Sequence, residues 1–225
     1  MTGTDGGFWG LLTAAERMGL SALGRDSTFA RRATICVEGE PATYVFVLVN
    51  GWAKIFTVTE GGHEVVLALR GQGDIVGEIA GETTGHRTAT VQAIEAVHAL
   101  IVGYDRFSSF LDSNPGAARA YRRVMTQRWS DAAAMLRIRA VTSGAQRLAR
   151  LLLDLAGRHG KANDGEIHVV MPLTQEELAS LAGASRATVT RAYSDWRRRN
   201  LIRTGQRHIT ITDVAGLRQV AGQRT

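Results

Sequence analysis

The fold of the second half of this chain is decided by Leu173–Arg199, which read LTQEELASLAGASRATVTRAYSDWRRR. Thr174, with Glu177 three residues later, has the spacing of a capping box and predicts the start of a helix. Gly183 lies where the chain has to turn, and Ser185 is suited to cap a second helix. The stretch therefore predicts two helices joined by a tight turn.

The two faces of the second predicted helix differ in character. Val189, Tyr193 and Trp196 recur at positions i, i+4 and i+7, which predicts a buried stripe. With the small Ala179 before the turn, this spacing is typical of a helix-turn-helix whose second helix reads the major groove of DNA. An ordinary helical hairpin with a basic, solvated face is the alternative. The opposite face carries Arg186, Ala187, Thr190, Arg191 and Ser194.

The distribution of charge favours the DNA-binding interpretation. Residues 141–225 contain 13 Lys and Arg against 7 Asp and Glu, whereas residues 1–140 contain 14 of each kind. The whole net charge of +6 therefore lies in the part that carries the predicted helix-turn-helix. Such an excess attracts phosphates and predicts binding that weakens as salt is added.

Length and composition limit the class of protein. A chain of 225 residues with 44% hydrophobic residues predicts one or two domains with real cores. Cys36 is the single cysteine, which excludes an internal disulfide and argues against an iron–sulfur cluster. The first residues lack a basic segment followed by an apolar one, and no run of 18 apolar residues occurs. We therefore expect a cytoplasmic protein without a transmembrane span.

The first half of the chain predicts a small β-structure after one helix. Residues 8–24 predict the helix, with Thr13 and Glu16 as a second capping box and with Leu12, Met18, Leu20 and Leu23 facing inward. Short β-branched and aromatic runs then alternate with glycine turns about every ten residues, which predicts an antiparallel β-roll or jelly roll able to hold one small ligand. The predicted strands are Thr34–Val37, Tyr44–Asn50, Gly51–Thr57, Glu64–Leu69, Thr88–Glu95 and Val97–Val102.

The sequence next predicts a short helix at residues 105–112. A long helix follows, which begins at Pro115 and ends near Arg139. Tyr121, Met125, Trp129, Ala132 and Leu136 recur along the long helix at spacings of three or four, so this stripe needs a partner. The partner is either the same helix of a second copy or the core of the β-roll.

A further helix at residues 146–157 begins the last domain. The predicted strands Ile167–Met171, Leu201–Arg203 and His208–Thr212 make it a winged helix-turn-helix. Arg207 and His208 lie at the tip of the wing, where they contact phosphate or are merely exposed.

The most informative stretch of the first half is Gly71–Ala89, which reads GQGDIVGEIAGETTGHRTA. We expect Gly77 and Glu78 to end a strand, where the carboxylate accepts hydrogen bonds from hydroxyls such as those of a ribose. Arg87 and Thr88 follow after a short loop and offer a guanidinium and a hydroxyl to a phosphodiester. A structural ion pair between Glu78 and Arg87 is the alternative.

The order of these motifs resembles the Crp/Fnr family of bacterial transcription regulators over residues 10–220. The resemblance implies an α+β fold with an antiparallel β-roll sensor domain at 1–113, a long dimerisation helix at 114–140 and a winged helix-turn-helix domain at 141–225. It also implies a homodimer that binds a palindromic operator in double-stranded DNA, with RNA polymerase as a further partner. No cofactor is required, and a cyclic nucleotide, first of all cyclic AMP, is the implied effector.

The resemblance assigns roles only where motifs match. In the sensor, Glu78 would hold the ribose 2′-hydroxyl, Arg87 and Thr88 the cyclic phosphate, and Gly77 and Ile79 would line the site. On DNA, Arg186 and Arg191 would contact base edges. Polar contacts with phosphate, or helix caps, are implied at Thr174, Ser185, Thr188, Thr190 and Arg207.

The chain departs from the family pattern at three places. Cyclic-AMP activators carry a Thr-Ser pair on the long helix, where this chain has Ala132 and Ala133. The loop over residues 81–86 is short. A glutamate usually follows the first recognition arginine, and here Ala187 replaces it, which predicts a changed or relaxed half-site.

Other functions are weighed against this one. The same DNA-binding role without an effector, or with another one such as a cyclic dinucleotide, stays open. So does a nucleotide-sensing subunit that acts on a protein partner. A haem sensor would use His63, His86 or His98, and a cupin-type metal site would need a His-x-His cluster that the chain lacks. No nucleophile–base pair or Walker-type loop predicts an enzyme.

Overall fold

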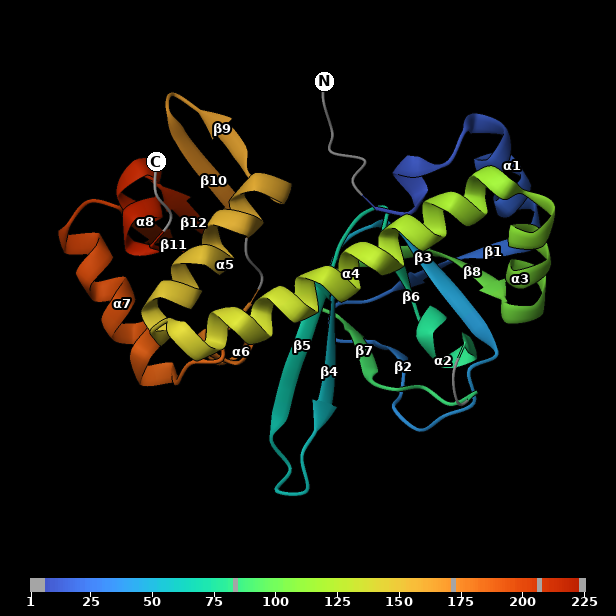
Figure 1. The fold of residues 1–225 in the computed structure, drawn as a ribbon, viewed down its shortest axis with the longest axis horizontal. Coiled ribbons are helices and arrows are strands. Elements are labelled where there is room, and N and C mark those ends of the chain that lie inside the picture. Colours follow the sequence, from blue (N-terminus) through green and yellow to red (C-terminus); the bar gives the residue numbers. More distant parts are fainter. Residues whose placement is uncertain (1–6, 83–84, 171–172, 206–207, 223–225) are drawn as a thin grey trace. The chain divides into compact units, whose positions relative to one another are not determined.

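The computed structural model describes residues 7–82, 85–170, 173–205 and 208–222. The chain divides into two compact units, residues 1–131 and residues 132–225. The first unit contains two β-sheets with accompanying helices, and the second is a winged helix-turn-helix (Figure 1). Among the described residues, no helix is both long enough and apolar enough to cross a membrane.

The first unit is an antiparallel β-roll made of two four-stranded sheets, as the glycine-separated strands predicted. One sheet has the strand order β1-β8-β3-β6 and the other the order β2-β7-β4-β5. The six predicted strands are confirmed with ends shifted by no more than two residues. Strand β1 was not predicted, and β6 is the strand that was expected to end at Gly77 and Glu78. The strands are β1 Gly24–Phe29, β2 Thr34–Cys36, β3 Tyr44–Asn50, β4 Ala53–Val58, β5 Glu64–Arg70, β6 Ile75–Val76, β7 Thr90–Ala93 and β8 Val97–Gly103.

Strand β3 contributes to both hydrophobic clusters of the first unit. Phe46 and Leu48 point into the cluster shared with Ile35, Cys36, Val91 and Ala93 of the second sheet. Val45 and Val47 point the opposite way, into a cluster formed with the helices. Because successive side chains of a strand alternate between its faces, a strand covered on both sides reads as a continuous apolar run.

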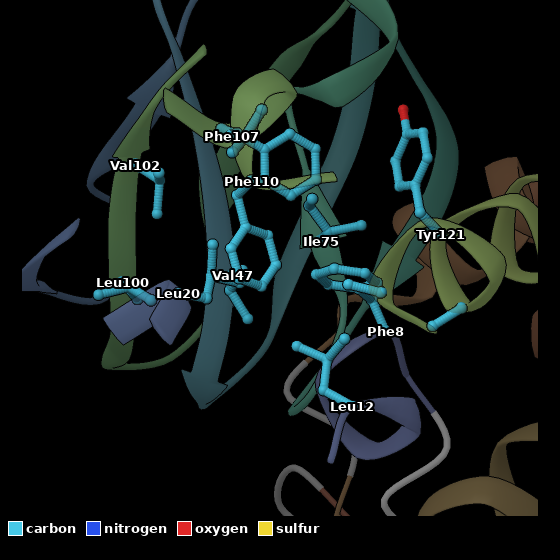
Figure 2. Close-up of a cluster of buried hydrophobic side chains, with 13 residues drawn as sticks. Phe8, Leu12, Leu20, Val47, Ile75, Leu100, Val102, Phe107, Phe110 and Tyr121 are labelled. Atoms are coloured by element: carbon cyan, nitrogen blue, oxygen red, sulfur yellow. The ribbon is translucent and has the colours of Figure 1, made fainter. Parts of the chain in front are cut away.

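Helices η1, α1 and α3 and the first part of α4 cover one face of the β1-β8-β3-β6 sheet. Figure 2 shows Phe8, Phe107 and Tyr121 in this cluster, where their rings meet edge to face at centroid distances of 5.6–6.2 Å. The capping box of Thr13 and Glu16 is confirmed. Met18 is 70% exposed, so its predicted inward position is wrong, because the buried face is centred on Leu20 instead. The helices are the 3-10 helix η1 Trp9–Leu11, α1 Ala14–Leu23, α2 Glu78–Glu82, α3 Tyr104–Ser113 and α4 Pro115–Val141.

The predicted apolar stripe of α4 divides along the helix. Tyr121 is buried and Met125 packs against the cluster of the first unit. Trp129, one turn further on, is 80% exposed. Packing on the β-roll therefore accounts for the first part of the stripe and leaves Trp129 uncovered, while Leu136 lies among side chains that the structure does not describe.

The second unit is a winged helix-turn-helix. Its sheet has the order β11-β12-β10-β9, and helices α5, α6 and α7 pack together beside it. Strand β9 and helix α8 were not predicted. The wing residue Arg207 lies outside the described residues, while His208 is exposed at the start of β12. The elements are α5 Gly144–His159, β9 Lys161–Asn163, β10 Glu166–Val170, α6 Gln175–Ala182, α7 Arg186–Arg198, β11 Ile202–Gly205, β12 His208–Ile211 and α8 Val214–Val220.

Candidate functional site

Gly77 redirects the chain between β6 and α2. Its φ is +81°, which glycine adopts without strain, and a Cβ at this position would lie 2.4 Å from Nη1 of Arg87. The prediction that Glu78 ends a strand is therefore wrong. Strand β6 ends at Val76, and Glu78 is the first residue of α2 because Gly77 turns the backbone before it.

The guanidinium of Arg87 is buried and held by the main chain. Arg87 is 5% exposed, donates from Nη1 to the carbonyl of Gly77 at 2.8 Å and from Nη2 to that of Tyr44 at 2.7 Å. Its Cζ also lies 5.5 Å from the centroid of the Phe46 ring. These hydrogen-bond acceptors are neutral, and they leave three of the five N–H donors for another group. A buried cation in such surroundings favours the approach of an anion.

The carboxylate of Glu78 pairs with Arg128 of α4 rather than with Arg87. Arg128 Nη1 lies 2.6 Å from Glu78 Oε1, and Glu78 is 2% exposed. Nη2 of Arg128 donates to the carbonyl of Ile75 at 2.9 Å and approaches Asp74 Oδ1 at 3.4 Å. The alternative of a Glu78–Arg87 ion pair is therefore wrong, and α4 is fastened to the segment that carries Glu78.

Arg128 and Asp74 also belong to this site, although the sequence motifs did not single them out. Arg128 lies seven residues after the buried Tyr121 and three after Met125, which places all three on one helix face. That spacing is the signal that predicts an inward-facing arginine. The remaining predicted residues are more open, since Ile79 is 49% exposed and Thr88 is also exposed.

Helices α6 and α7 form the predicted turn with the predicted caps. Thr174 Oγ1 accepts from the Glu177 N–H at 3.1 Å, and Glu177 Oε2 accepts from the Thr174 N–H at 2.8 Å. Gly183 ends α6 at φ +58°, a left-handed conformation suited to glycine. Ser185 Oγ accepts from the Thr188 N–H at 3.1 Å and starts α7, with Thr188 Oγ1 2.9 Å away.

The predicted faces of α7 are confirmed. Val189, Tyr193 and Trp196 are buried. Arg186, Ala187, Thr190, Arg191 and Ser194 are exposed together on the other side. Within the described residues, the side chain of Arg191 makes no hydrogen bond or ion pair. The face thus presents an exposed arginine beside short side chains, which a DNA groove accommodates.

Two side chains of the first turn of α6 reach this face. Arg186 Nη1 lies 3.0 Å from Glu176 Oε1, and Thr190 Oγ1 donates to Gln175 Oε1 at 3.0 Å. Neither Gln175 nor Glu176 was singled out in the sequence.

Arg147 of α5 supports the turn between α6 and α7. Its Nε donates to the Ala182 carbonyl at 2.8 Å and its Nη2 to the Gly183 carbonyl at 2.5 Å. Its Nη1 donates to the carbonyl of Thr142, which precedes α5. One buttressing arginine therefore fixes the last carbonyls of α6 and the residues before α5 in a single arrangement.

A β-roll with a buried cation, a long helix and a winged helix-turn-helix define the class of cyclic-nucleotide-binding-type DNA-binding regulators. The cyclic nucleotide-binding domain family matches residues 27–114, and the Crp-like helix-turn-helix domain family matches residues 146–220. The chain belongs to the Crp/Fnr family of transcription regulators and is not an enzyme.

Relatives support this assignment, and a solved structure shares the fold. The chain is 31% identical over 207 residues to the CRP-like cAMP-activated global transcriptional regulator of Mycobacterium tuberculosis, covering 91% of this chain and 92% of that one. It is 26% identical over 187 residues to the cyclic AMP receptor protein of Thermus thermophilus, covering 83% of each. The structure of FixK2 from Bradyrhizobium japonicum has the same fold, with a TM-score of 0.78, 19% identity, and 90% of this chain and 99% of that chain covered.

Proposed function

We propose that this regulator is a homodimer that binds a palindromic operator under the control of a cyclic nucleotide, with cyclic AMP as the first candidate. The observation that carries the proposal is Arg87, a buried guanidinium with neutral main-chain acceptors and unused donors. The names of two relatives, one called cAMP-activated and one called a cyclic AMP receptor, support cyclic AMP. A regulator without an effector, or one that binds a cyclic dinucleotide, remains the alternative because Ala132 and Ala133 supply no hydroxyl to an adenine.

Each side of the nucleotide has a partner of suitable chemistry. Arg87 and Thr88 hold the cyclic phosphate, since a guanidinium and a hydroxyl both donate to phosphate oxygens. Glu78 accepts from the ribose 2′-hydroxyl, and Gly77 and Ile79 line the site. Every one of these residues lies between the end of β6 and the start of β7.

Arg128 connects the nucleotide site with α4. Nη1 of Arg128 lies 2.6 Å from Oε1 of Glu78. A ribose that binds the Glu78 carboxylate therefore either shares this carboxylate with Arg128 or displaces Arg128 from it. Either outcome changes the hold of α4 on the β-roll. Nucleotide occupancy is thereby linked to the position of the helix that we propose as the dimer contact, where the 80% exposed Trp129 meets the second copy.

On DNA, the face of α7 enters the major groove. Arg186 and Arg191 read base edges, and the two recognition helices of the dimer lie one DNA turn, roughly 34 Å, apart. RNA polymerase is a partner at the promoter, and the protein acts in the cytoplasm. The phosphate contacts that we assign are Thr174, Ser185, Thr188, Thr190 and the wing residue Arg207.

Calorimetric titration tests the effector. Cyclic AMP, cyclic GMP and cyclic di-GMP are added separately to the wild-type protein, to Arg87→Lys and to Arg31→Lys, an exposed arginine of the same unit. We expect one cyclic AMP per chain, a loss of at least tenfold in affinity for Arg87→Lys, and no change for Arg31→Lys. If the wild type and Arg87→Lys bound cyclic AMP with equal affinity, Arg87 would not be the phosphate-binding residue. If another nucleotide bound in place of cyclic AMP, that nucleotide would be the effector.

A further inference from the structure

We propose that Glu176 is a specificity-determining residue of the DNA-binding face, where it holds Arg186 for contact with bases and away from phosphates. The proposal rests on the proposed reading of base edges by Arg186. Its basis is the ion pair that crosses from the first turn of α6 to the first turn of α7, with Glu176 Oε1 3.0 Å from Arg186 Nη1.

The ion pair contributes little to the stability of the fold. Its side chains are 69% and 70% exposed, and exposed pairs are weak because water screens them. The start of α6 is already capped by Thr174 and Glu177 without help from Glu176. Glu176 therefore favours folding mainly through its charge in the first turn of α6, and its contact with Arg186 adds little to stability.

The geometry leaves Arg186 able to bind a base while it is paired. Glu176 engages Nη1, and the other N–H donors of the guanidinium stay available for O6 and N7 of a guanine. The hydroxyl of Thr190 lies between two acceptors, Oε1 of the neighbouring Gln175 at 3.0 Å and the carbonyl of Arg186 at 3.1 Å. Two consecutive residues of α6 thus orient two residues of the recognition face.

The charge of Glu176 supplies the discrimination. The first turn of α7 has no acidic residue, and position 187 beside Arg186 is alanine. Glu176 is thus the carboxylate that faces Arg186. Without it, a long arginine at the N-terminal end of a basic helix turns readily to a backbone phosphate, which carries no sequence information. When DNA excludes water from the face, the pair becomes stronger and its orientation better defined.

The test compares Glu176→Gln with Glu177→Gln. Both variants remove one negative charge from the same helical turn, but Glu177 caps Thr174 and a glutamine keeps that cap. The wild-type protein, with cyclic AMP added, is first used to select a preferred DNA duplex from a pool of random sequences. Arg186→Ala then identifies the base pair whose preference depends on Arg186.

Affinities are next measured for the preferred duplex, for the duplex changed at that base pair, and for an unrelated duplex over a range of salt concentrations. We expect Glu176→Gln to lose most of the preference at that base pair, about a tenfold change. We also expect it to bind the unrelated duplex more tightly, with a slope of log affinity against log salt steeper by about 0.9, the value for one added phosphate contact. Glu176→Asp should restore part of the preference.

Equal behaviour of Glu176→Gln and Glu177→Gln, with the base preference kept in both, would overturn the proposal. A wild-type protein that selects no sequence would overturn the proposed operator binding and this inference together, so the two failures are distinguishable.

Discussion

Each unit contains an ion pair between an arginine and a glutamate. The distance from Nη1 to Oε1 is 2.6 Å in the Arg128–Glu78 pair of the first unit and 3.0 Å in the Arg186–Glu176 pair of the second. The side chains of the first pair are 16% and 3% exposed, whereas those of the second are 69% and 70% exposed. A buried pair is costly to break because the charge left behind has no water to solvate it. An exposed pair exchanges its partners cheaply, as a surface that binds DNA requires.

The largest expected effect is on the buried pair. Arg128→Ala leaves the Glu78 carboxylate buried without a partner, and we expect the free energy of unfolding of the first unit to fall by about 3–5 kcal/mol. Amide hydrogen exchange of β3 and β8 reports the stability of this unit separately from the second. The double variant Arg128→Met with Glu78→Gln should recover much of the lost free energy of unfolding. If Arg128→Ala lost less than about 1 kcal/mol, the buried pair would not differ from the exposed pair in its effect on stability.

Gly77→Ala tests the close approach of Arg87 to the backbone at Gly77. Alanine meets both a φ of +81° and a Cβ position 2.4 Å from Arg87 Nη1, so we expect a loss of about 2–3 kcal/mol in unfolding free energy. Gly85→Ala is the matched control, because its φ is +74° but no heavy atom lies within 4 Å of the added Cβ. It should cost about 1–2 kcal/mol from backbone strain alone. Equal losses in the two variants would mean that the contact with Arg87 is unimportant.

Thr174→Ala tests the scaffold under the exposed pair. Loss of the side-chain cap of α6 should lower the unfolding free energy of the second unit by about 1 kcal/mol. Thermal unfolding followed by circular dichroism measures it, with Thr174→Ser as the control that keeps the hydroxyl. If the serine variant lost as much as the alanine variant, the cap would not be the cause.

The smallest effect on stability is expected at the exposed pair itself. Glu176→Gln should change the unfolding free energy of the second unit by less than about 1 kcal/mol. Chemical denaturation of the wild type and the variant under identical conditions is the measurement. A larger loss would give Glu176 a structural role and weaken its assignment to sequence discrimination.

The elements that the sequence predicted share a strong local signal. The capping boxes at Thr13 and Thr174, the glycine turn at Gly183 and the apolar run of β3 each follow from a few neighbouring residues, and the structure confirms them. Strand β1, which reads GRDSTF, was missed because it is a polar edge strand without hydrophobic alternation.

The candidate sites were less predictable than the elements. The partners of Glu78 and Arg186 are Arg128, 50 residues away, and Glu176, 10 residues away on another helix. Which charges meet depends on how helices pack, and local patterns carry no such information. The sequence therefore located Glu78, Arg87 and Arg186, but it missed the charged partners Arg128 and Glu176 and paired Glu78 with the wrong arginine in its structural alternative.

Strand β3 separates the two hydrophobic clusters of the first unit and contributes side chains to both. Val45 and Val47 belong to the helical side, Phe46 and Leu48 to the side of the second sheet, and Tyr44 and Phe46 also support Arg87. A slip of register by one residue would exchange the two sets of side chains. Because both layers share this strand, we expect the unit to unfold in one cooperative step, in which the proposed nucleotide site is lost as well.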